Sequence, residues 1–396
     1  MSPRQKTATK MEDLPELSKA GYAHVDGAPK PPPMANPNFT VADLKAAIPP
    51  HCFEKDTLRG FNVLFWNLFA CAVLFYGAYV VLELMQLPLP VKILGYMVYW
   101  YVQGSYGMGL WVIAHECGHY GFSNSNIIND IVGAFCHSIL MTPYHSWQIT
   151  HKIHHANTGS CENDEVYAPF TRSDLAPTWS DLVEDSPTYN LYRIVKMLLL
   201  GWMPGYLIVN SWGPAKYRTT TANHFNPDSA FYLPKERSVV VLSNIECLAV
   251  LAVTGYFIHN YGFWLVFNLY LAPLLVTNAY LVIITYLNHT DTFVPHLRED
   301  GWNWLHGNLC TVDRSFGKWL DGVLHRVTDT HVLHHLFPKI PHYHAAEAFE
   351  AIKPILGDYY LRDETPILLA LWRSTKFCKY VDDDGKVVFY KTKINS

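Results

Sequence analysis

The chain alternates between long apolar runs and polar stretches that are rich in histidine. Four runs carry little or no charge and cover residues 61–82, 93–114, 238–258 and 263–287. About 20 residues of α-helix rise roughly 30 Å, which is the thickness of the hydrocarbon core of a bilayer. The pattern therefore predicts an all-α integral membrane protein with four transmembrane helices.

The segments around these runs predict three regions. Residues 1–60 form a polar, proline-rich N-terminal tail, which we expect to be loosely ordered, and residues 376–396 form a C-terminal tail. The membrane domain spans residues 61–375. Within it the run at 197–211 is short and interrupted by Gly and Pro, so we expect it at the membrane surface.

Lysine and arginine indicate how the chain is oriented. They occur in both tails and in the stretch from 115 to 237, whereas the short turns between the apolar runs carry almost none. Positively charged loops tend to stay on the cytosolic side. We therefore expect both termini and the large middle segment to face the cytosol.

Composition supports the membrane assignment. Half of the residues are apolar and 16% are charged, below the roughly 25% that is typical of soluble domains. The net charge of −4 gives no basic footprint, so we expect no nucleic acid partner. The eight cysteines include no C-x-x-C pair, which argues against a zinc ribbon or a redox pair.

Histidines provide the candidate chemistry. Three motifs, HECGH (115–119), HKIHH (151–155) and HVLHH (331–335), place histidines at i, i+3 or i+4, which share one face of a helix. With four spans, all three motifs reach the same cytosolic rim. The eight imidazoles are His115, His119, His151, His154, His155, His331, His334 and His335. Eight is too many for one tetrahedral zinc.

Several kinds of metal protein remain compatible with these motifs. HECGH alone matches the H-E-x-x-H signature of zinc metalloproteases, and an intramembrane zinc protease would need one further ligand. A membrane receptor with a structural metal is another possibility. Imidazole binds zinc, copper, iron and nickel, so the ligand type does not select the metal. A histidine-held pair of irons with open positions for oxygen could oxidise an unactivated C–H bond.

Longer stretches carry a resemblance to a known family. WVIAHECGH, PYHSWQITHKIHHANTGSCENDEV, ITYLNHTDT and DTHVLHHLFPKIPHYHAAEA resemble the membrane-bound fatty acid desaturases, and within them the acyl-lipid delta-12 (oleate) desaturases. The resemblance implies two non-heme irons, molecular oxygen as cosubstrate and a location in the endoplasmic reticulum, with the di-iron cap on the cytosolic side. It also implies conversion of oleoyl to linoleoyl chains on glycerolipid. No heme-binding HPGG motif occurs, so electrons would come from separate cytochrome b5 and NADH-cytochrome b5 reductase.

The resemblance also implies roles for individual residues. The eight histidines of the motifs would be iron ligands, and no catalytic residue beyond the ligands is expected. A ninth ligand would stand near the end of the fourth run, where His289 fits and His325 is a rival. Glu116 and Asp329 are candidates for orienting ligand imidazoles, as carboxylates behind metal-bound histidines often do.

Two positions depart from the plant delta-12 pattern. Tyr120 follows the first motif where another histidine is usual, and Asp291 stands where those enzymes often have histidine. Omega-3 (delta-15) desaturases vary at the same places. An omega-3 desaturase, or a bifunctional desaturase and hydroxylase, therefore stays open as an alternative.

Overall fold

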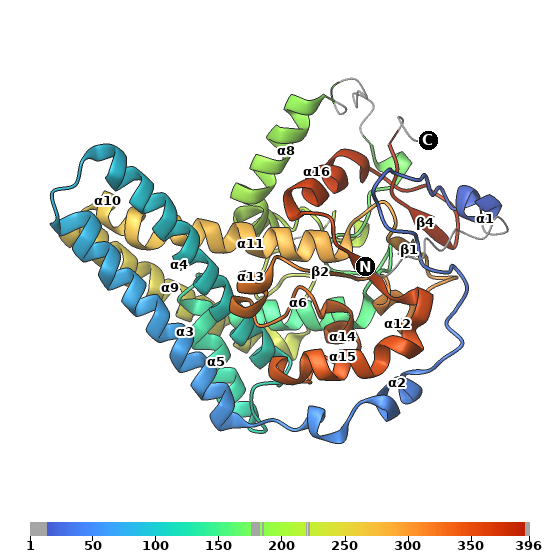
Figure 1. The fold of residues 1–396 in the computed structure, drawn as a ribbon, viewed down its shortest axis with the longest axis horizontal. Helices are drawn as coiled ribbons and strands as arrows, with labels where there is room; N and C mark the ends of the chain where they lie inside the picture. Colours follow the sequence, from blue (N-terminus) through green and yellow to red (C-terminus); the bar gives the residue numbers. More distant parts are fainter. Residues whose placement is uncertain (1–13, 176–182, 184–185, 219, 221, 393–396) are drawn as a thin grey trace, which may run out of the picture.

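The computed structural model describes residues 14–175, 183, 186–218, 220 and 222–392. Long helices form an elongated bundle, and shorter helices with a few strands form a cap at one end of it (Figure 1). The predominantly helical architecture confirms the predicted fold class.

The bundle contains the four predicted apolar runs. Its members are α3 (Thr57–Ala78), α4 (Leu89–Gly118), α9 (Arg237–Tyr261), α10 (Phe263–Val266) and α11 (Ala272–His289). A π-helical segment (Tyr79–Leu84) extends α3, and another (Phe267–Leu271) joins α10 to α11. Asp56 caps the N-terminus of α3, because its carboxylate accepts a hydrogen bond from the backbone N–H of Arg59.

The cap is built from short elements around the histidine motifs. The other helices of the described chain are α1 (Leu14–Lys19), α2 (Val41–Ala47), α5 (Asn126–Ser138), α6 (Tyr144–Asn157), α8 (Pro187–Leu200), α12 (Trp304–Asn308), α13 (Lys318–Val323), α14 (His331–Leu336), α15 (His342–Leu356) and α16 (Ile367–Phe377). Strand β1 (Pro295–Leu297) pairs antiparallel with β4 (Val387–Phe389), and β2 (Val312–Arg314) pairs parallel with β3 (Leu361–Asp363).

Four described helical stretches are long and apolar enough to cross a membrane: Thr57–Leu84, Pro187–Val209, Pro234–Tyr261 and Phe263–His289. Three of them contain predicted spans. The second predicted span forms α4, a continuous helix of 30 residues. Helix α4 is not among the four apolar stretches, because it is rich in Tyr, Trp and Gly, although its 30 residues are long enough to cross a membrane.

The stretch Pro187–Val209 contains the run that the sequence places at the membrane surface. Its backbone leaves helical geometry at Met203 (φ −116°, ψ 122°), just before Pro204. Helix α8 before this break has 14 residues, or about 21 Å, which is shorter than the hydrocarbon core. Its length fits a helix at the membrane surface, and it packs against α11 and α16 of the cap.

Close packing of α4 against α11 positions the histidines that end these helices. A Cβ atom on Gly104 would lie 2.6 Å from Cβ of Val276, so only glycine permits this approach. The hydroxyl of Thr277 donates a hydrogen bond to the carbonyl oxygen of Gly104 across the interface (3.0 Å). The two helices thereby bring His115 and His289 to the same end of the bundle.

The described part of the N-terminal tail, residues 14–60, packs against the cap, contrary to the loose order expected for residues 1–60. Phe39, Leu44 and Ile48 are buried in one hydrophobic core with α14 and α15. At the other end of the chain, Phe389 of β4 is fully buried. Apolar side chains between the prolines, which the overall polarity of residues 1–60 conceals, anchor the N-terminal segment to the cap.

A buried ion-pair network follows α11 directly. The carboxylate of Asp291 accepts hydrogen bonds from Arg314 (2.6 Å) and Arg373 (2.7 Å), and both arginines also contact Asp363. The side chains of Asp291 and Arg314 are fully inaccessible to solvent. The network fixes the chain just beyond His289 to β2, β3 and α16.

Replacing Asp291 with alanine is expected to destabilise the protein by about 3–5 kcal/mol, because two buried guanidinium groups lose a shared partner. Thermal unfolding of the purified protein in detergent measures the effect. Asp300→Ala changes an exposed carboxylate nearby and serves as the control. Equal melting temperatures for the two variants would contradict a stabilising role for the network.

Candidate metal centre

The structure gathers nine histidines into two adjacent clusters. The five-histidine cluster consists of His115, His119, His151, His155 and His334, whose donor nitrogens lie within 4.8 Å of one another. His154, His289 and His335 form a second such group, and His331 joins it through a 3.0 Å approach of its Nε2 to Nε2 of His289. We call these four the four-histidine cluster.

The second and third motifs each divide their histidines between the clusters, whereas His115 and His119 of the first motif both belong to the five-histidine cluster. In α6, His151 and His155 belong to the five-histidine cluster and His154 to the other, and α14 separates His334 from His335 in the same way. Helices α4 and α11 add ligand candidates from the bundle. The clusters therefore sit where the cap helices meet the ends of two membrane helices.

The nitrogen spacing fits a metal ion in each cluster. Nε2 of His151 lies 2.9 Å from Nε2 of His115 and 3.1 Å from Nε2 of His155. Nε2 of His334 lies 3.2 Å from Nε2 of His155. Metal–nitrogen bonds of about 2.1 Å at angles of 90–110° separate neighbouring ligand nitrogens by about 3.0–3.4 Å. A hydrogen bond between two imidazoles can account for only one close pair of nitrogens. Several nitrogens that converge on one point therefore indicate a site for a metal cation.

Hydrogen bonds at the outer ring nitrogens aim the inner ones at the clusters. Nδ1 of His331 lies 3.2 Å from the carbonyl oxygen of Val327, and Nδ1 of His335 lies 3.2 Å from Oδ1 of Asn308. Nε2 of His335 and Nε2 of His119 are buried without a hydrogen-bond partner. Such unpaired buried nitrogens are costly in an apolar surrounding, and coordination would satisfy them.

Burial also keeps these imidazoles unprotonated. Desolvation, followed by the neighbouring imidazoles, lowers the pKa of His151, His155 and His334 well below the usual value. Desolvation lowers the pKa of His331 to about 3. Neutral imidazole is the form that binds metals, so the environment favours coordination at neutral pH.

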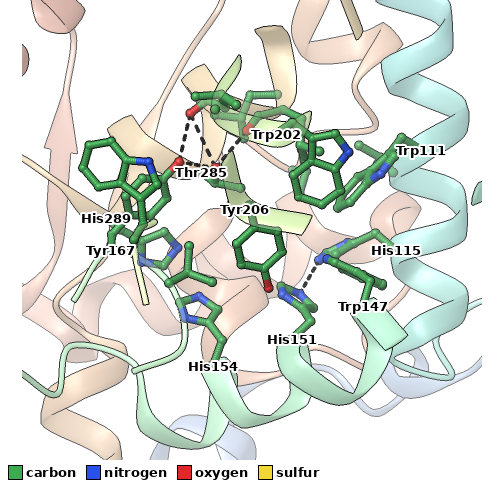
Figure 2. A pocket seen from close by; sticks show the side chains of 18 of the residues that line it. Trp111, His115, Trp147, His151, His154, Tyr167, Trp202, Tyr206, Thr285 and His289 are labelled. Carbon is green, nitrogen blue, oxygen red and sulfur yellow. Dashed lines mark hydrogen bonds between the residues drawn. The ribbon is translucent and has the colours of Figure 1, made fainter. Parts of the chain in front are cut away.

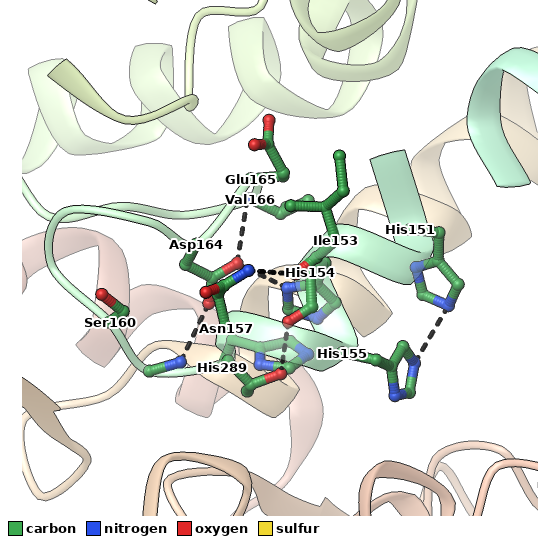
Figure 3. A network of polar contacts seen from close by, with 12 residues as sticks. His151, Ile153, His154, His155, Asn157, Ser160, Asp164, Glu165, Val166 and His289 are labelled. Atoms are coloured by element: carbon green, nitrogen blue, oxygen red, sulfur yellow. Dashed lines mark hydrogen bonds and ion pairs between the residues drawn. The ribbon is translucent and has the colours of Figure 1, made fainter. Parts of the chain in front are cut away.

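Asp164 is a site residue that the sequence analysis missed. Its Oδ1 lies 2.5 Å from Nδ1 of His154, and its Oδ2 accepts a hydrogen bond from the N–H of Gly159 (2.9 Å), as Figure 3 shows. The pair is almost completely buried. Asp164 lies in CENDEV, shortly after HKIHH, so its proximity to the second motif was the available signal.

The other expected residues take different places. The carboxylate of Asp329 forms an ion pair with Arg326 (3.0 Å) rather than with an imidazole of either cluster. Glu116 contacts Nδ1 of His342 at 2.5 Å and belongs to neither cluster. His325, the rival of His289, packs its ring against His342 at 4.8 Å and also lies outside both clusters.

A narrow apolar cavity ends at the clusters. Trp111, Trp202 and Tyr206 form much of its wall, and Thr285 and Tyr167 contribute a hydrogen-bonded pair (2.9 Å), as Figure 2 shows. Histidines of both clusters close one end: His115, His151, His154, His289 and His331. The apolar and aromatic lining suits a slender apolar molecule.

The sequence profile of the fatty acid desaturase family matches residues 93–365. This segment includes all nine clustered histidines and most of the cavity lining. The chain belongs to the fatty acid desaturase family. It is an oxidoreductase that desaturates fatty acyl chains, and a protease function for HECGH is wrong.

Characterised relatives resemble the chain over most of its length. A Delta(12) fatty acid desaturase of Calendula officinalis is 44% identical over 366 residues, which cover 91% of this chain and 94% of that protein. A Delta(12)-oleate desaturase of Trichosanthes kirilowii is 42% identical, with coverages of 91% and 98%. An Omega-6 fatty acid desaturase, endoplasmic reticulum isozyme 2, of Glycine max is 43% identical, with coverages of 91% and 94%.

Replacing Asp164 with asparagine is expected to lower desaturase activity about 10–100-fold, the usual cost of losing a carboxylate behind a metal-bound histidine. Asparagine keeps the size of the side chain but removes the charge that orients His154. Activity and bound iron per protein measure the effect. Glu162→Gln removes a neighbouring carboxylate that pairs with Arg298 and should leave both values unchanged.

Proposed function

We propose that the chain is an oxygen-dependent delta-12 desaturase that converts oleoyl chains on glycerolipid to linoleoyl chains. The names of the relatives support the position of the new double bond, since all three compared above are Delta(12) or Omega-6 desaturases. The observation that carries the proposal is the apolar cavity that ends at imidazoles of both clusters.

The proposed cofactor is a pair of non-heme irons, one in each histidine cluster. The ligands would be the five-histidine cluster for one iron and the four-histidine cluster for the other. Bound irons would supply the oxygen-derived oxidant that removes hydrogen from unactivated C–H bonds. The donor set supports iron because neutral imidazoles bind it well and leave positions for oxygen.

The chain itself binds and orients the substrate. The aromatic wall around Trp111, Trp202 and Tyr206 would hold the acyl chain by apolar contact and exclude water from the clusters. The cavity then brings two adjacent methylenes to the histidine end, so that hydrogens leave from the same side and the product is cis.

The reaction also requires electrons and protons. Two hydrogens from the substrate, two electrons and two protons reduce one oxygen molecule to two waters. Because the chain has no heme-binding motif, we propose cytochrome b5 and NADH-cytochrome b5 reductase as the separate electron donors.

An omega-3 desaturase or a hydroxylase is the alternative within the same chemistry. Tyr120 and Asp291, the two departures from the plant pattern, are absent from the cavity lining. Asp291 instead belongs to the buried ion-pair network. Neither departure contacts the acyl site directly, which favours the delta-12 assignment.

We propose that the protein resides in the endoplasmic reticulum, with both termini and the active site facing the cytosol. The name of the Glycine max relative supports this location. With α3, α4, α9 and α11 crossing the membrane, each pair of crossings returns the chain to the side of the cap (Figure 1).

Reporter tags at residue 20 and at the C-terminus are both expected to be accessible from the cytosol. The physical reason is that His115 and His331 must reach one site, which an even number of crossings permits. Protease protection of tagged microsomes measures this. A lumenal position for either tag would contradict the four-span topology.

The direct test of the function is expression in a yeast that makes oleate but no linoleate, followed by fatty acid analysis.

A further inference from the structure

A second group of metal-ligating side chains lies in the cap, separate from the two histidine clusters. His51 and Cys52 come from a single 3₁₀ turn (Pro50–Phe53), and His344 and Glu347 lie one turn apart on α15. One donor atom from each of the four lies within 4.8 Å of all the others. Thiolate, imidazole and carboxylate are all ligand types that zinc binds, and four of them match its tetrahedral coordination.

The distances within the group fit tetrahedral coordination. Sγ of Cys52 lies 3.7 Å from Nε2 of His51, and the same Nε2 lies 3.0 Å from Oε1 of Glu347. With zinc–nitrogen and zinc–oxygen bonds of about 2.1 Å and a zinc–sulfur bond of about 2.3 Å, tetrahedral ligands give an N···S separation of about 3.6 Å and an N···O separation of about 3.4 Å. Small side-chain movements would bring all four donors to an ion.

Burial around the group is one-sided. Cys52 is fully buried and packs in the hydrophobic core that contains Leu44 and Ile48. The side chains of His51 and Glu347 are 51% and 53% exposed, which leaves a path for an ion from the solvent. A thiol backed by apolar side chains and facing two polar, accessible ligands has the surroundings of a structural zinc site.

A simple ion pair explains less of this arrangement. It would account for His51 and Glu347, but not for the thiol of Cys52 and the second imidazole of His344 converging on them. The ring of His344 lies 5.4 Å from that of His51. Exposed ion pairs contribute little stability, so they give no reason for this convergence.

We propose that His51, Cys52, His344 and Glu347 bind a structural zinc ion that fastens the N-terminal segment to α15. The site joins two segments that are almost 300 residues apart in the chain. It also lies one helical turn or less from His342, whose imidazole contacts Glu116 of the first histidine motif. The zinc thus stabilises the cap beside the catalytic clusters without taking part in the reaction.

The experiment uses full-length, iron-loaded enzyme in detergent, to which Co²⁺ is added as a spectroscopic substitute for zinc. A thiolate bound to Co²⁺ gives a charge-transfer absorption in the near ultraviolet, and the histidine clusters contain no thiolate. We expect this band in the wild type, and one zinc per chain in addition to iron by elemental analysis.

Cys52→Ser and His344→Ala are expected to remove the band and to weaken zinc binding at least about tenfold, while the iron content stays unchanged. Cys71→Ser is the matched control, because its thiol lies in α3 and contacts Asn67 instead. His51→Ala changes an exposed side chain and provides a second test if the buried Cys52 variant folds poorly.

Two results would overturn the proposal. One is the absence of the thiolate–cobalt band in the wild type. The other is a band and a zinc content that persist in both His51→Ala and Cys52→Ser. Because the readouts are zinc and cobalt binding, they are independent of whether the iron-loaded enzyme is a delta-12 desaturase.

Discussion

Replacing His334 with alanine is expected to reduce desaturase activity below detection, a loss of more than about 100-fold, while the protein still accumulates in membranes. Nε2 of His334 lies 3.2 Å from that of His155, and its ring lies 4.5 Å from the ring of His115. Alanine would leave a vacant or water-filled ligand position in the five-histidine cluster. The oxidant would then be lost or misplaced relative to the substrate, and displacements of about 1 Å are enough to cost two orders of magnitude.

Two further substitutions serve as comparisons for the loss of activity expected from His334→Ala. His259→Ala removes an exposed histidine in the last turn of α9 and should leave activity unchanged. His342→Ala should cost far less than His334→Ala, because His342 contacts Glu116 and belongs to neither cluster. Iron analysis separates loss of metal from loss of fold. Near-normal product from His334→Ala would contradict its assignment as a ligand.

The apolar runs and the eight histidines of the three motifs could be recognised because their signals are local, whereas His289 was indicated only by the family resemblance. An uncharged run of about 20 residues is itself the signal of a membrane helix, and α3, α4, α9 and α11 occupy the predicted runs. Helical spacing likewise places the histidines of HKIHH on one face, and α6 contains all three of them.

The division of the second and third motifs between two clusters could not be predicted. His154 and His155 are neighbours in sequence, yet they belong to different clusters, which draw their other histidines from α4, α11 and α14. That relation depends on the tertiary packing of these helices. The pairing of Asp164 with His154 depends on the turn at Gly159, whose positive φ (74°) redirects the chain. Neither feature has a periodic signal in the sequence.

The anchoring of the N-terminal segment was missed for a different reason. Average polarity describes residues 1–60 correctly, but burial there depends on single side chains such as Leu44, which is fully buried. The same limit applies to Asp291. Sequence comparison marks it as a departure from the plant pattern, and only the structure connects it to Arg314 and Arg373.

Expression of the chain in yeast that makes oleate but no polyunsaturated fatty acids is expected to yield linoleate without any added substrate. Trp202 and Tyr206 line the cavity that ends at the histidines, so in the proposed function they would set how far an acyl chain reaches toward them. The depth of insertion would therefore select which two methylenes react. The relatives whose alignments cover 91% of this chain are named for the delta-12 or omega-6 position. Gas chromatography of total fatty acids, with the double-bond position established by mass spectrometry, measures the product.

The matched control is the same strain carrying His334→Ala, which should contain oleate and no linoleate. A strain that stays free of linoleate, yet converts supplied linoleate to alpha-linolenate, would show that the delta-12 assignment is wrong and would establish the omega-3 alternative. A hydroxylated oleate would instead indicate that the same clusters transfer oxygen to the chain. All three outcomes use the same metal site, because the depth and the angle at which the cavity holds the acyl chain determine which bond is attacked.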